Sequence, residues 1–344
     1  MPLPADGLLT LTPQGLYCRA AQAWIDPWRP VPRALITHAH ADHARPGCGE
    51  YWAIASSEGI LRQRLGQDIR LLPVDYGQVL AIGDARVSFH SAGHVLGSAQ
   101  IRLEAGAESW LVSGDYKRCP DPSCIPFEPV TADVFITEAT FGLPIYRWQS
   151  GTEIARQIQA WWQQAPDRPS VLLAYAFGKA QRLLAELAAI GVEQEVLLHG
   201  AVHNLMASYR EAGVAMPPTA PLSSLPRGAS LAGRLVLAPP AAERGKGMRQ
   251  LAGAQTAFVS GWMAVRGARR RRGYGRGFVL SDHADWDGLV RTVRQSRAQQ
   301  VYVTHGQSDV LARYLREVEG ISAAPLAGHF EAERSGSDEQ AEPA

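Results

Sequence analysis

The sequence predicts an α/β protein built from two modules, and three observations support this prediction. The first 140 residues contain short apolar runs separated by turn residues, a pattern typical of strands in sheets. From about residue 151, apolar residues recur at helical spacing and alternate with short buried runs. A length of 344 residues with 46% hydrophobic content is enough for a full core and favours two modules over one.

Short strands dominate the predicted first half of the chain. They are expected, in chain order, at 8–18, 23–28, 33–40, 79–94, 99–115 and 133–140. The third of these runs into a loop, and the 79–94 segment contains two strands joined by a Gly-Asp turn. One short helix is predicted at 58–66.

Helices and buried strands alternate in the second half. Helices are predicted at 152–165 and 179–191, and buried strands at 170–177, 194–200 and 233–240. This alternation predicts a parallel α/β module. Two strand–turn–helix units follow, and the polar tail is expected to be disordered. The expected division is 1–167, the inserted module 168–262, a returning part 263–330 and the tail 331–344.

Residues able to do chemistry follow the predicted strands. Each of the following comes directly after an apolar run: His38, His40, His94, Asp115, Glu138, His283 and His305. Unrelated surface residues would not be expected to share this placement, whereas catalytic groups on α/β scaffolds commonly do. The sequence therefore predicts one site at the ends of the strands.

The stretch "LITHAHADHARPG" at 35–47 has the residue types and spacing of a metal site. In an extended segment, residues two apart point to the same side, so His38 and His40 can converge on one ion. Asp42 and His43 follow at a turn and can face a second ion. Imidazole and carboxylate ligands suit zinc, and manganese accepts the same set. A polar surface turn is the alternative interpretation, which the ligand-type residues elsewhere in the chain disfavour.

Later motifs extend this pattern into a family resemblance. "HAHADH" at 38–43, "GH" at 93–94 and "GD" at 114–115 form the motif series of the metallo-β-lactamase superfamily. Motifs similar to those of its β-CASP branch, which are nucleases of DNA and RNA, are "TEATFG" at 137–142, "AFGKAQRL" at 176–183, "FVSGW" at 258–262, "SDHAD" at 281–285 and "VTHG" at 303–306. The chain most resembles the bacterial ligase-associated DNA exonucleases, also called exonucleases of the β-lactamase fold or mRNA 3′-end processing factors.

This resemblance implies a metallo-β-lactamase αββα sandwich with an inserted β-CASP parallel α/β module, and two divalent ions as cofactors. It assigns His38, His40, His94 and Asp115 to one ion, and Asp42, His43, the shared Asp115 and His305 to the other. A histidine at 305 resembles the RNA-cleaving branch, whereas the DNA crosslink-repair branch has valine there. The type of polymer cleaved is therefore left open.

Such a site suits hydrolysis of a phosphodiester bond. Paired divalent ions lower the pKa of bound water toward about 7 and stabilise charge on the phosphoryl oxygens. The expected catalytic residues are Asp42, His283 and Glu138. Asp42 is a metal ligand, His283 is the acid that protonates the leaving 3′-oxygen, and Glu138 holds the imidazole ring of His283. Products would be a 5′-phosphate and a 3′-hydroxyl. Alternatively, Glu138 caps a loop, and His283 is a turn residue before a helix capped by Asp285.

A basic stretch, "RGARRRRGYGRGF" at 266–278, is a candidate for gripping a nucleic-acid backbone. Its central residues are Arg269, Arg270, Arg271 and Arg272. Lys117 and Lys179 are weaker candidates for phosphate contacts. A solvated basic loop is the alternative interpretation.

We therefore expect a DNA exonuclease acting on single-stranded or end-containing DNA, in DNA repair with an ATP-dependent DNA ligase and a large helicase. The main alternative is a β-CASP RNase of the 3′-end processing type. A small-molecule hydrolase on the same sandwich, or a binding protein without catalysis, are further alternatives. No apolar run is long enough to span a membrane and no basic-then-apolar leader is visible, so a cytoplasmic location is expected. Four cysteines without paired spacing fit a reducing compartment.

Overall fold

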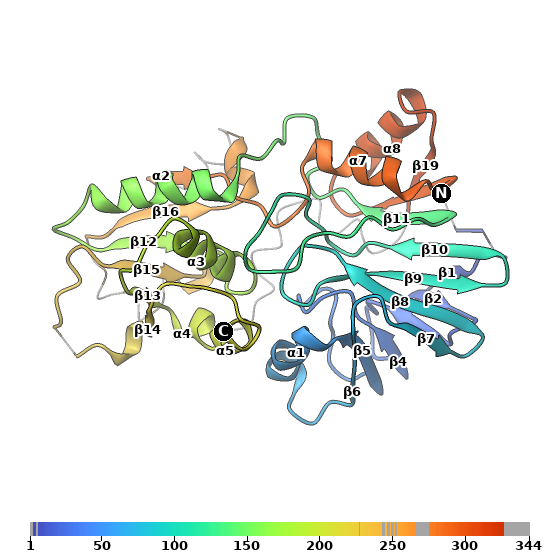
Figure 1. The fold of residues 1–344 in the computed structure, drawn as a ribbon, viewed down its shortest axis with the longest axis horizontal. Coiled ribbons are helices and arrows are strands. Elements are labelled where there is room, and N and C mark those ends of the chain that lie inside the picture. Colours follow the sequence, from blue (N-terminus) through green and yellow to red (C-terminus); the bar gives the residue numbers. More distant parts are fainter. Residues whose placement is uncertain are drawn as a thin grey trace. The chain divides into compact units, whose positions relative to one another are not determined.

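The computed structural model describes residues 3–4, 6–226, 228–242, 245, 248, 251, 253–265 and 275–326. Within these residues the chain forms three sheets with flanking helices (Figure 1), which confirms the predicted α/β class. The chain divides into two compact units. Of the described residues, unit 1 comprises those within 1–118, 125–147 and 283–326, and unit 2 comprises those within 119–124 and 148–282.

Unit 1 contains two sheets. The first has the order β1-β2-β3-β4-β5-β6, with strands at Leu9–Thr12, Gly15–Cys18, Ala23–Ile25, Arg33–Leu35, Glu50–Ile54 and Leu71–Val74. The second has the order β19-β18-β11-β10-β9-β8-β7. Its strands β7 to β11 are, in chain order, Val79–Ile82, Ala85–Ser91, Ala99–Ala105, Glu108–Val112 and Val134–Glu138. Strand β18 is Gln300–Thr304 and β19 is Ser322–Pro325. Parallel pairing of β10, β11 and β18 brings the carboxyl ends of these strands to one edge.

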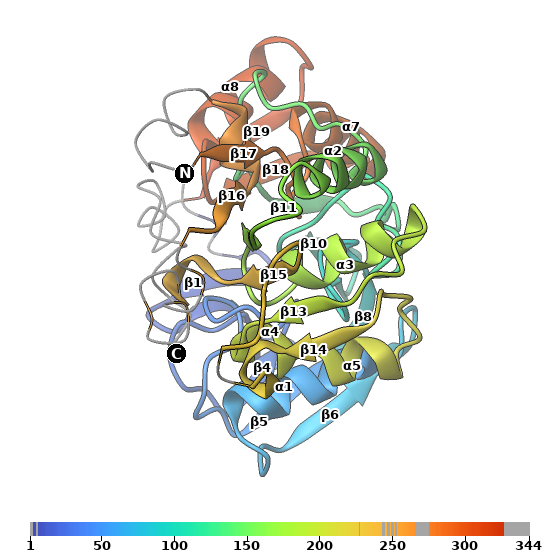
Figure 2. The same ribbon diagram turned by 90° about the vertical axis from the view of Figure 1, so that its left-hand side faces the viewer.

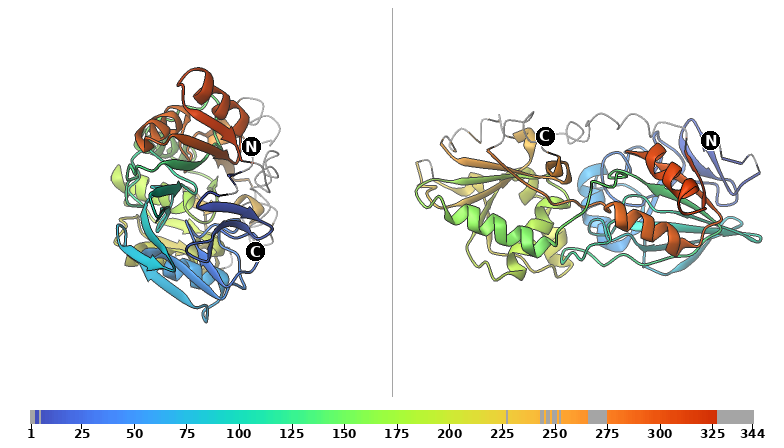
Figure 3. Two further views of the ribbon diagram at one scale, coloured as in Figure 1. Left: turned by 90° about the vertical axis from the view of Figure 1, so that its right-hand side faces the viewer. Right: turned by 90° about the horizontal axis from the view of Figure 1, so that it is seen from above.

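Two hydrophobic cores hold unit 1 together. One lies between the sheets, where Leu16 and Ile25 of the first sheet pack with Phe89, Ile101 and Trp110 of the second. The other lies on the opposite face of the second sheet and includes α7 (Trp286–Ser296) and α8 (Ser308–Glu317). Figure 3 shows these two helices packed on that face. Short helix α1 (Glu58–Leu65) lies beside β5.

Unit 2 is built on one sheet whose strands all pair in parallel (Figure 2). Its order is β14-β13-β15-β12-β16-β17, with strands Thr219–Pro221, Val196–Leu198, Leu235–Ala238, Ser170–Leu173, Gln255–Val259 and Arg276–Phe278. The helices are α2 (Gly151–Gln163), α3 (Lys179–Ala189), α4 (Gly200–His203) and α5 (Met206–Glu211). Among the described residues, short 3₁₀ turns occur at Ala55–Ser57, Leu222–Ser224, Pro240–Ala242 and Gly261–Ala264.

The predicted module at 168–262 lies within unit 2, which extends further at both ends. At the amino end, α2 joins the unit because its apolar face, which includes Ile154 and Ile158, packs beside α3. At the carboxyl end, β17 pairs with β16. The predicted helices at 58–66, 152–165 and 179–191 correspond to α1, α2 and α3. Strands β5, β6, β14, β16 and β19 were not predicted. In the described part of the chain, no helix has the length and apolar character needed to cross a membrane.

Candidate active site

All the predicted metal ligands lie in unit 1, in loops that follow strands. His38, His40, Asp42 and His43 follow β4, and His94 lies between β8 and β9. Asp115 follows β10, and His305 follows β18. Strand β4 belongs to the first sheet and β8, β10 and β18 to the second, so the loops that meet here come from both sheets of unit 1.

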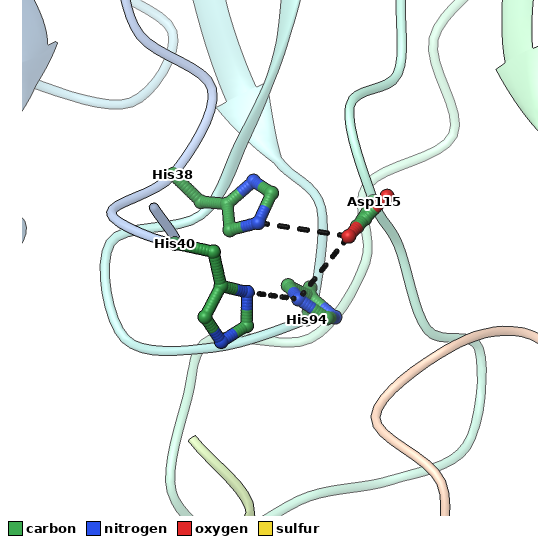
Figure 4. Close-up of side chains that lie close together, drawn as sticks. All are labelled: His38, His40, His94 and Asp115. Atoms are coloured by element: carbon green, nitrogen blue, oxygen red, sulfur yellow. Dashed lines mark hydrogen bonds and ion pairs between the residues drawn. The ribbon is translucent and has the colours of Figure 1, made fainter. Parts of the chain in front are cut away.

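The first group of ligands comprises His38, His40, His94 and Asp115, whose ligand atoms all lie within 4.8 Å of one another (Figure 4). Asp115 Oδ2 lies 3.6 Å from His38 Nε2 and 3.7 Å from His94 Nε2. His94 Nε2 lies 3.2 Å from His40 Nδ1. Three imidazoles and a carboxylate converging at this distance form a donor set that zinc prefers.

A second group shares Asp115 with the first. It comprises His43, Asp115 and His305, again within 4.8 Å. The same oxygen, Asp115 Oδ2, lies 3.6 Å from His43 Nε2. Asp42 joins through His43, with 3.4 Å between Asp42 Oδ2 and His43 Nε2. Asp115 therefore belongs to both groups, as a bridging carboxylate would. These two groups together are called the histidine cluster below.

The buried nitrogens of the histidine cluster fit a metal ion better than a protein partner. His38 Nε2 and His43 Nε2 are both buried and have no hydrogen-bond partner. An orphaned buried polar atom is costly in a folded protein unless something else satisfies it. A divalent cation would accept both lone pairs, so the residues present fit such an ion.

Asp26 orients two of these ligands, although the sequence did not single it out. Its Oδ2 lies 2.7 Å from His43 Nδ1 and accepts a 2.5 Å hydrogen bond from Thr37 Oγ1. Thr37 Oγ1 in turn lies 3.1 Å from His38 Nδ1. With both Nδ1 atoms engaged, both Nε2 lone pairs point to the ligand position, as in other histidine metal sites. An acidic residue directly after the apolar run "AWI" is the signal that sequence reasoning missed.

Burial and mutual charge set the protonation of the histidine cluster. Burial, followed by the neighbouring imidazoles of His43, His94 and His40, holds the pKa of His38 well below its usual value. Burial raises the pKa of Asp115 to about 7. For His43 burial lowers the pKa, but the carboxylates around it outweigh burial and hold the pKa well above its usual value. These carboxylates attract positive charge to the position that a cation would take.

Glu138 and His283 form a separate pair beside Asp115. Glu138 Oε2 lies 3.0 Å from His283 Nδ1, and its carboxylate accepts hydrogen bonds from the backbone N–H groups of Tyr116 and Thr140. His283 Nδ1 also lies 3.9 Å from Asp115 Oδ2. Asp115, Glu138 and His283 are close enough to hold a cation. However, the two backbone bonds already satisfy much of the Glu138 carboxylate, which favours an orienting role.

The loop that carries His305 presses against the loop that follows Glu138. His305 and Gly306 both have left-handed backbones, with φ of 54° and 52°. A Cβ at 306 would lie 2.2 Å from the Ala139 oxygen and 2.5 Å from Thr140 Cα, so only glycine fits. The Gln307 N–H donates to the Ala139 carbonyl at 2.8 Å.

The predicted phosphate-binding lysines are buried. Lys117 is 1% exposed, and its Nζ donates to the His94 carbonyl at 3.0 Å. Lys179 is 5% exposed and its Nζ lies 3.1 Å from Asp282 Oδ2. This burial argues against direct phosphate contacts and gives both side chains structural partners instead. The predicted contacts at Arg269, Arg270, Arg271 and Arg272 lie outside the described residues.

Lys179 belongs to a second buried group of charges, in unit 2, which we call the arginine cluster. Its members are Lys179, Arg182, Asp121, Glu186 and Asp282. Arg182 Nη1 donates to the Ser281 carbonyl at 2.5 Å, and Arg182 lies 3.5 Å from Asp121 and 3.7 Å from Glu186. Burial lowers the pKa of Arg182, but Asp121, Asp282 and Glu186 raise it further, so the guanidinium stays charged.

Sequence comparisons find relatives longer than this chain. Over 307 residues it is 33% identical to a protein named "Probable DNA ligase" from Opitutus terrae, covering 88% of this chain and 30% of that protein. Over 198 residues it is 29% identical to "Endoribonuclease YSH1" of Yarrowia lipolytica, covering 48% and 22%. Over 167 residues it is 28% identical to "Transcription termination factor FttA" of Methanosarcina mazei, covering 46% and 25%. The chain spans less than a third of each of these relatives.

The remaining comparisons address the fold. No family model matches the chain. A crystal structure of a protein of unknown function from Enterococcus faecalis matches with a TM-score of 0.57 and 11% sequence identity, covering 86% of this chain and 79% of that one. At this identity the likeness concerns the fold alone.

Proposed function

We propose that this chain is a nuclease that depends on two divalent ions and shortens DNA from an end. Its relatives support membership of the metallo-β-lactamase/β-CASP family. The observation that carries this proposal is the histidine cluster, in which two buried imidazole nitrogens face carboxylates but have no hydrogen-bond partner. Its position next to the Glu138–His283 pair provides both metal ligands and a proton donor at one edge of the sheet.

The residues divide the work between binding and proton transfer. His38, His40, His94 and Asp115 would hold one ion, and Asp42, His43, Asp115 and His305 the other, with zinc or manganese as the metal. Two divalent ions held there would supply Lewis acidity toward a phosphodiester and water that ionises near neutral pH. Asp26 and Thr37 keep the imidazoles in the ligating tautomer.

His283 is assigned the proton that the leaving 3′-oxygen needs. Its Nδ1 faces the Glu138 carboxylate at 3.0 Å, so its Nε2 is the nitrogen left to carry the transferred proton. Burial raises the pKa of Glu138, but the His283 charge and hydrogen bond, with those of Thr140 and Tyr116, lower it on balance. An ionised Glu138 favours the imidazolium form of His283. The products would be a 5′-phosphate and a 3′-hydroxyl.

DNA is the proposed substrate because the similarity that spans most of this chain is to a protein named as a DNA ligase. A physical or genetic link to an ATP-dependent ligase, and a role in DNA repair, are proposed on the same ground. A helicase partner, which the resemblance also implies, has no support among these relatives. A cytoplasmic location remains a prediction.

An RNase of the 3′-end processing type is the second candidate. It is favoured by the relatives named as endoribonucleases, which match about half of this chain, and by the histidine at position 305. The chemistry assigned to the site residues is the same for either polymer.

End-labelled oligonucleotides separate these candidates. Purified protein is incubated with single-stranded DNA, double-stranded DNA and the matching RNA, each with added Mn²⁺ or Zn²⁺, and Asp115→Ala prepared identically controls for contaminating nucleases. We expect a ladder of DNA products from one end with 5′-phosphate and 3′-hydroxyl termini. Cleavage confined to RNA would establish the second candidate. Intact oligonucleotides together with hydrolysis of a thioester would overturn both.

A further inference from the structure

The side chain of Arg118 packs against helix α7 of unit 1 and is held there in a fixed position. Arg118 lies three residues after Asp115, and its guanidinium stacks on the Phe127 ring with 4.3 Å between the guanidinium carbon and the ring centre. Its Nη1 donates to Thr292 Oγ1 at 3.0 Å. Its stem crosses Gly288, where a Cβ would lie 3.2 Å from Arg118 Cγ. A guanidinium already held by its stem, its face and one N–H loses little freedom when its other N–H groups bind a ligand.

Arg291 places a second positive charge beside Arg118. On α7 it is three residues after Gly288 and one before Thr292, so it borders the groove that Arg118 occupies, and its side chain is exposed. Burial and then the charge of Arg291 lower the pKa of Arg118, which is the effect of a close like charge.

Neither arginine has an acidic partner among the described residues. This distinguishes them from nearby arginines, since Arg294 pairs with Glu319 at 2.6 Å and Arg147 pairs with Asp287 at 2.8 Å. Arg118 crosses α7 at Gly288 and Thr292, and Arg291 extends from the same stretch of the helix, so an anion bound there would be attracted by both positive charges. Planar guanidinium donors match the oxygens of a phosphate.

The two arginines are close to the proposed acid along the chain. Asp285, two residues after His283, caps α7 by accepting a hydrogen bond from the Gly288 N–H at 2.9 Å. From Trp286 to Arg291 the helix rises roughly 7.5 Å. Arg118 likewise belongs to the segment that leaves the site after Asp115. A strand whose leaving oxygen meets His283 can therefore continue along the first turns of α7.

We propose that Arg118 and Arg291 form a phosphate subsite. It binds the phosphate next to the scissile phosphate on its 5′ side, which is the side of the leaving 3′-oxygen. This inference rests on the proposed nuclease function and gives the strand a direction across the site. The ligand is a phosphate of the polynucleotide. It is an internucleotide phosphodiester if cleavage starts at a 3′ end, and a terminal 5′-phosphate if it starts at a 5′ end.

Neutralising single phosphates tests the subsite. In end-labelled oligodeoxynucleotides, a methylphosphonate replaces the phosphate adjacent to the scissile bond on its 5′ side, or the one on its 3′ side. A further pair of substrates has a 5′-phosphate or a 5′-hydroxyl, which tests the terminal source. We expect wild-type kcat/KM to fall about tenfold or more when the 5′-side charge is removed, because a charged hydrogen-bonded contact is lost.

The double variant Arg118→Gln/Arg291→Ala should show the same loss on the unmodified substrate and no additional loss on the 5′-side analogue, while the 3′-side analogue still weakens it. Arg118→Lys, which keeps the charge but not the planar donors, should lose part of this activity. Arg294→Ala, one turn along the same helix and already paired with Glu319, is the matched control and should behave as wild type on every substrate.

Two outcomes would overturn the subsite. If the double variant Arg118→Gln/Arg291→Ala equals wild type, or if it remains fully sensitive to the 5′-side methylphosphonate, these arginines do not contact that phosphate, while the nuclease proposal stands. If the wild-type enzyme cleaves no polynucleotide, the proposed function fails and the subsite fails with it.

Discussion

The two buried charge clusters of this molecule use similar kinds of side chain and have different consequences. The arginine cluster in unit 2 sets two cations against three carboxylates, and every charge has an opposite charge within 4 Å. In the histidine cluster of unit 1, imidazoles surround one carboxylate, Asp115, and Asp42 lies beside them. An imidazole is neutral when unprotonated. Two buried nitrogens of this cluster, His38 Nε2 and His43 Nε2, have no hydrogen-bond partner; Arg182 Nε in the arginine cluster also lacks a hydrogen bond, but its charge is opposed by Asp121 and Glu186.

The difference teaches how to tell a structural cluster from a ligand site. A buried cluster in which each charge faces an opposite charge finds its partners within the protein, and removing a member exposes the remaining charges to a low-polarity interior. A buried cluster of imidazoles and carboxylates in which ring nitrogens lack hydrogen-bond partners fits a cation from solution. The first is therefore tested through stability, and the second through metal content and activity.

Removing the carboxylate shared by both ligand groups should have the largest effect. Asp115→Ala is expected to lose both ions and at least about 10³-fold in cleavage rate, because the variant lacks the residue common to the two groups. Metal analysis and oligonucleotide cleavage measure this. Because burial already penalises the Asp115 charge, the metal-free variant should be no less stable than metal-free wild type. Two ions retained per chain would contradict the shared ligand.

Removing the proposed acid sharpens the comparison by separating chemistry from metal binding. His283→Ala should retain two ions and bind oligonucleotide, but cleave about 10²–10⁴-fold more slowly because general acid catalysis is lost. Single-turnover rates and metal content are measured on the same preparation. Wild-type turnover would remove His283 from the mechanism.

Opening the arginine cluster should affect stability rather than chemistry. Arg182→Met leaves three buried carboxylates with one lysine, and we expect the free energy of unfolding to fall by about 3–5 kcal/mol. Urea unfolding measures this, with the exposed Arg294→Met as a control that should leave the midpoint nearly unchanged. The folded variant should still bind two ions. Loss of both ions from the folded variant would break the distinction between the clusters.

The smallest effect is expected from changing Asp26, whose carboxylate contacts the Nδ1 atom of His43. Asp26→Asn keeps the size of the side chain but weakens its hold on His43 Nδ1, so affinity for the ion on the His43 side should fall about 10–100-fold. Zinc titration measures it, and Asp133→Asn, whose carboxylate binds Ser109 instead, is the control. Equal affinities in the two variants would show that Asp26 does not orient the ligand.

Much of the fold and of the metal site could be predicted from local patterns. The spacing of His38 and His40, and the placement of Asp115 and His305 after apolar runs, identified residues that the structure brings together. Helices α2 and α3 were recognisable from apolar spacing over three turns. These features depend on neighbours in sequence, so one chain is enough to reveal them.

Other features depend on residues far apart in sequence. The burial of Lys179 follows from its pairing with Asp282, and no local pattern indicates that partner. The role of Asp26 requires that β3 and β4 pair in parallel, which brings it to Thr37 and His43. Strand β19 is four residues of weak strand character that becomes a strand because β18 is beside it.

The contact of Gly306 with Ala139 has a consequence for how this scaffold can change over generations. Since no other side chain is tolerated at 306, and since residues 139–140 touch its backbone, the His305 and Glu138 loops behave as one rigid piece. Lengthening either loop would therefore move His305, a proposed metal ligand, and Glu138, the proposed partner of His283, together. Selection at this edge therefore acts on both properties jointly, and neither can drift alone.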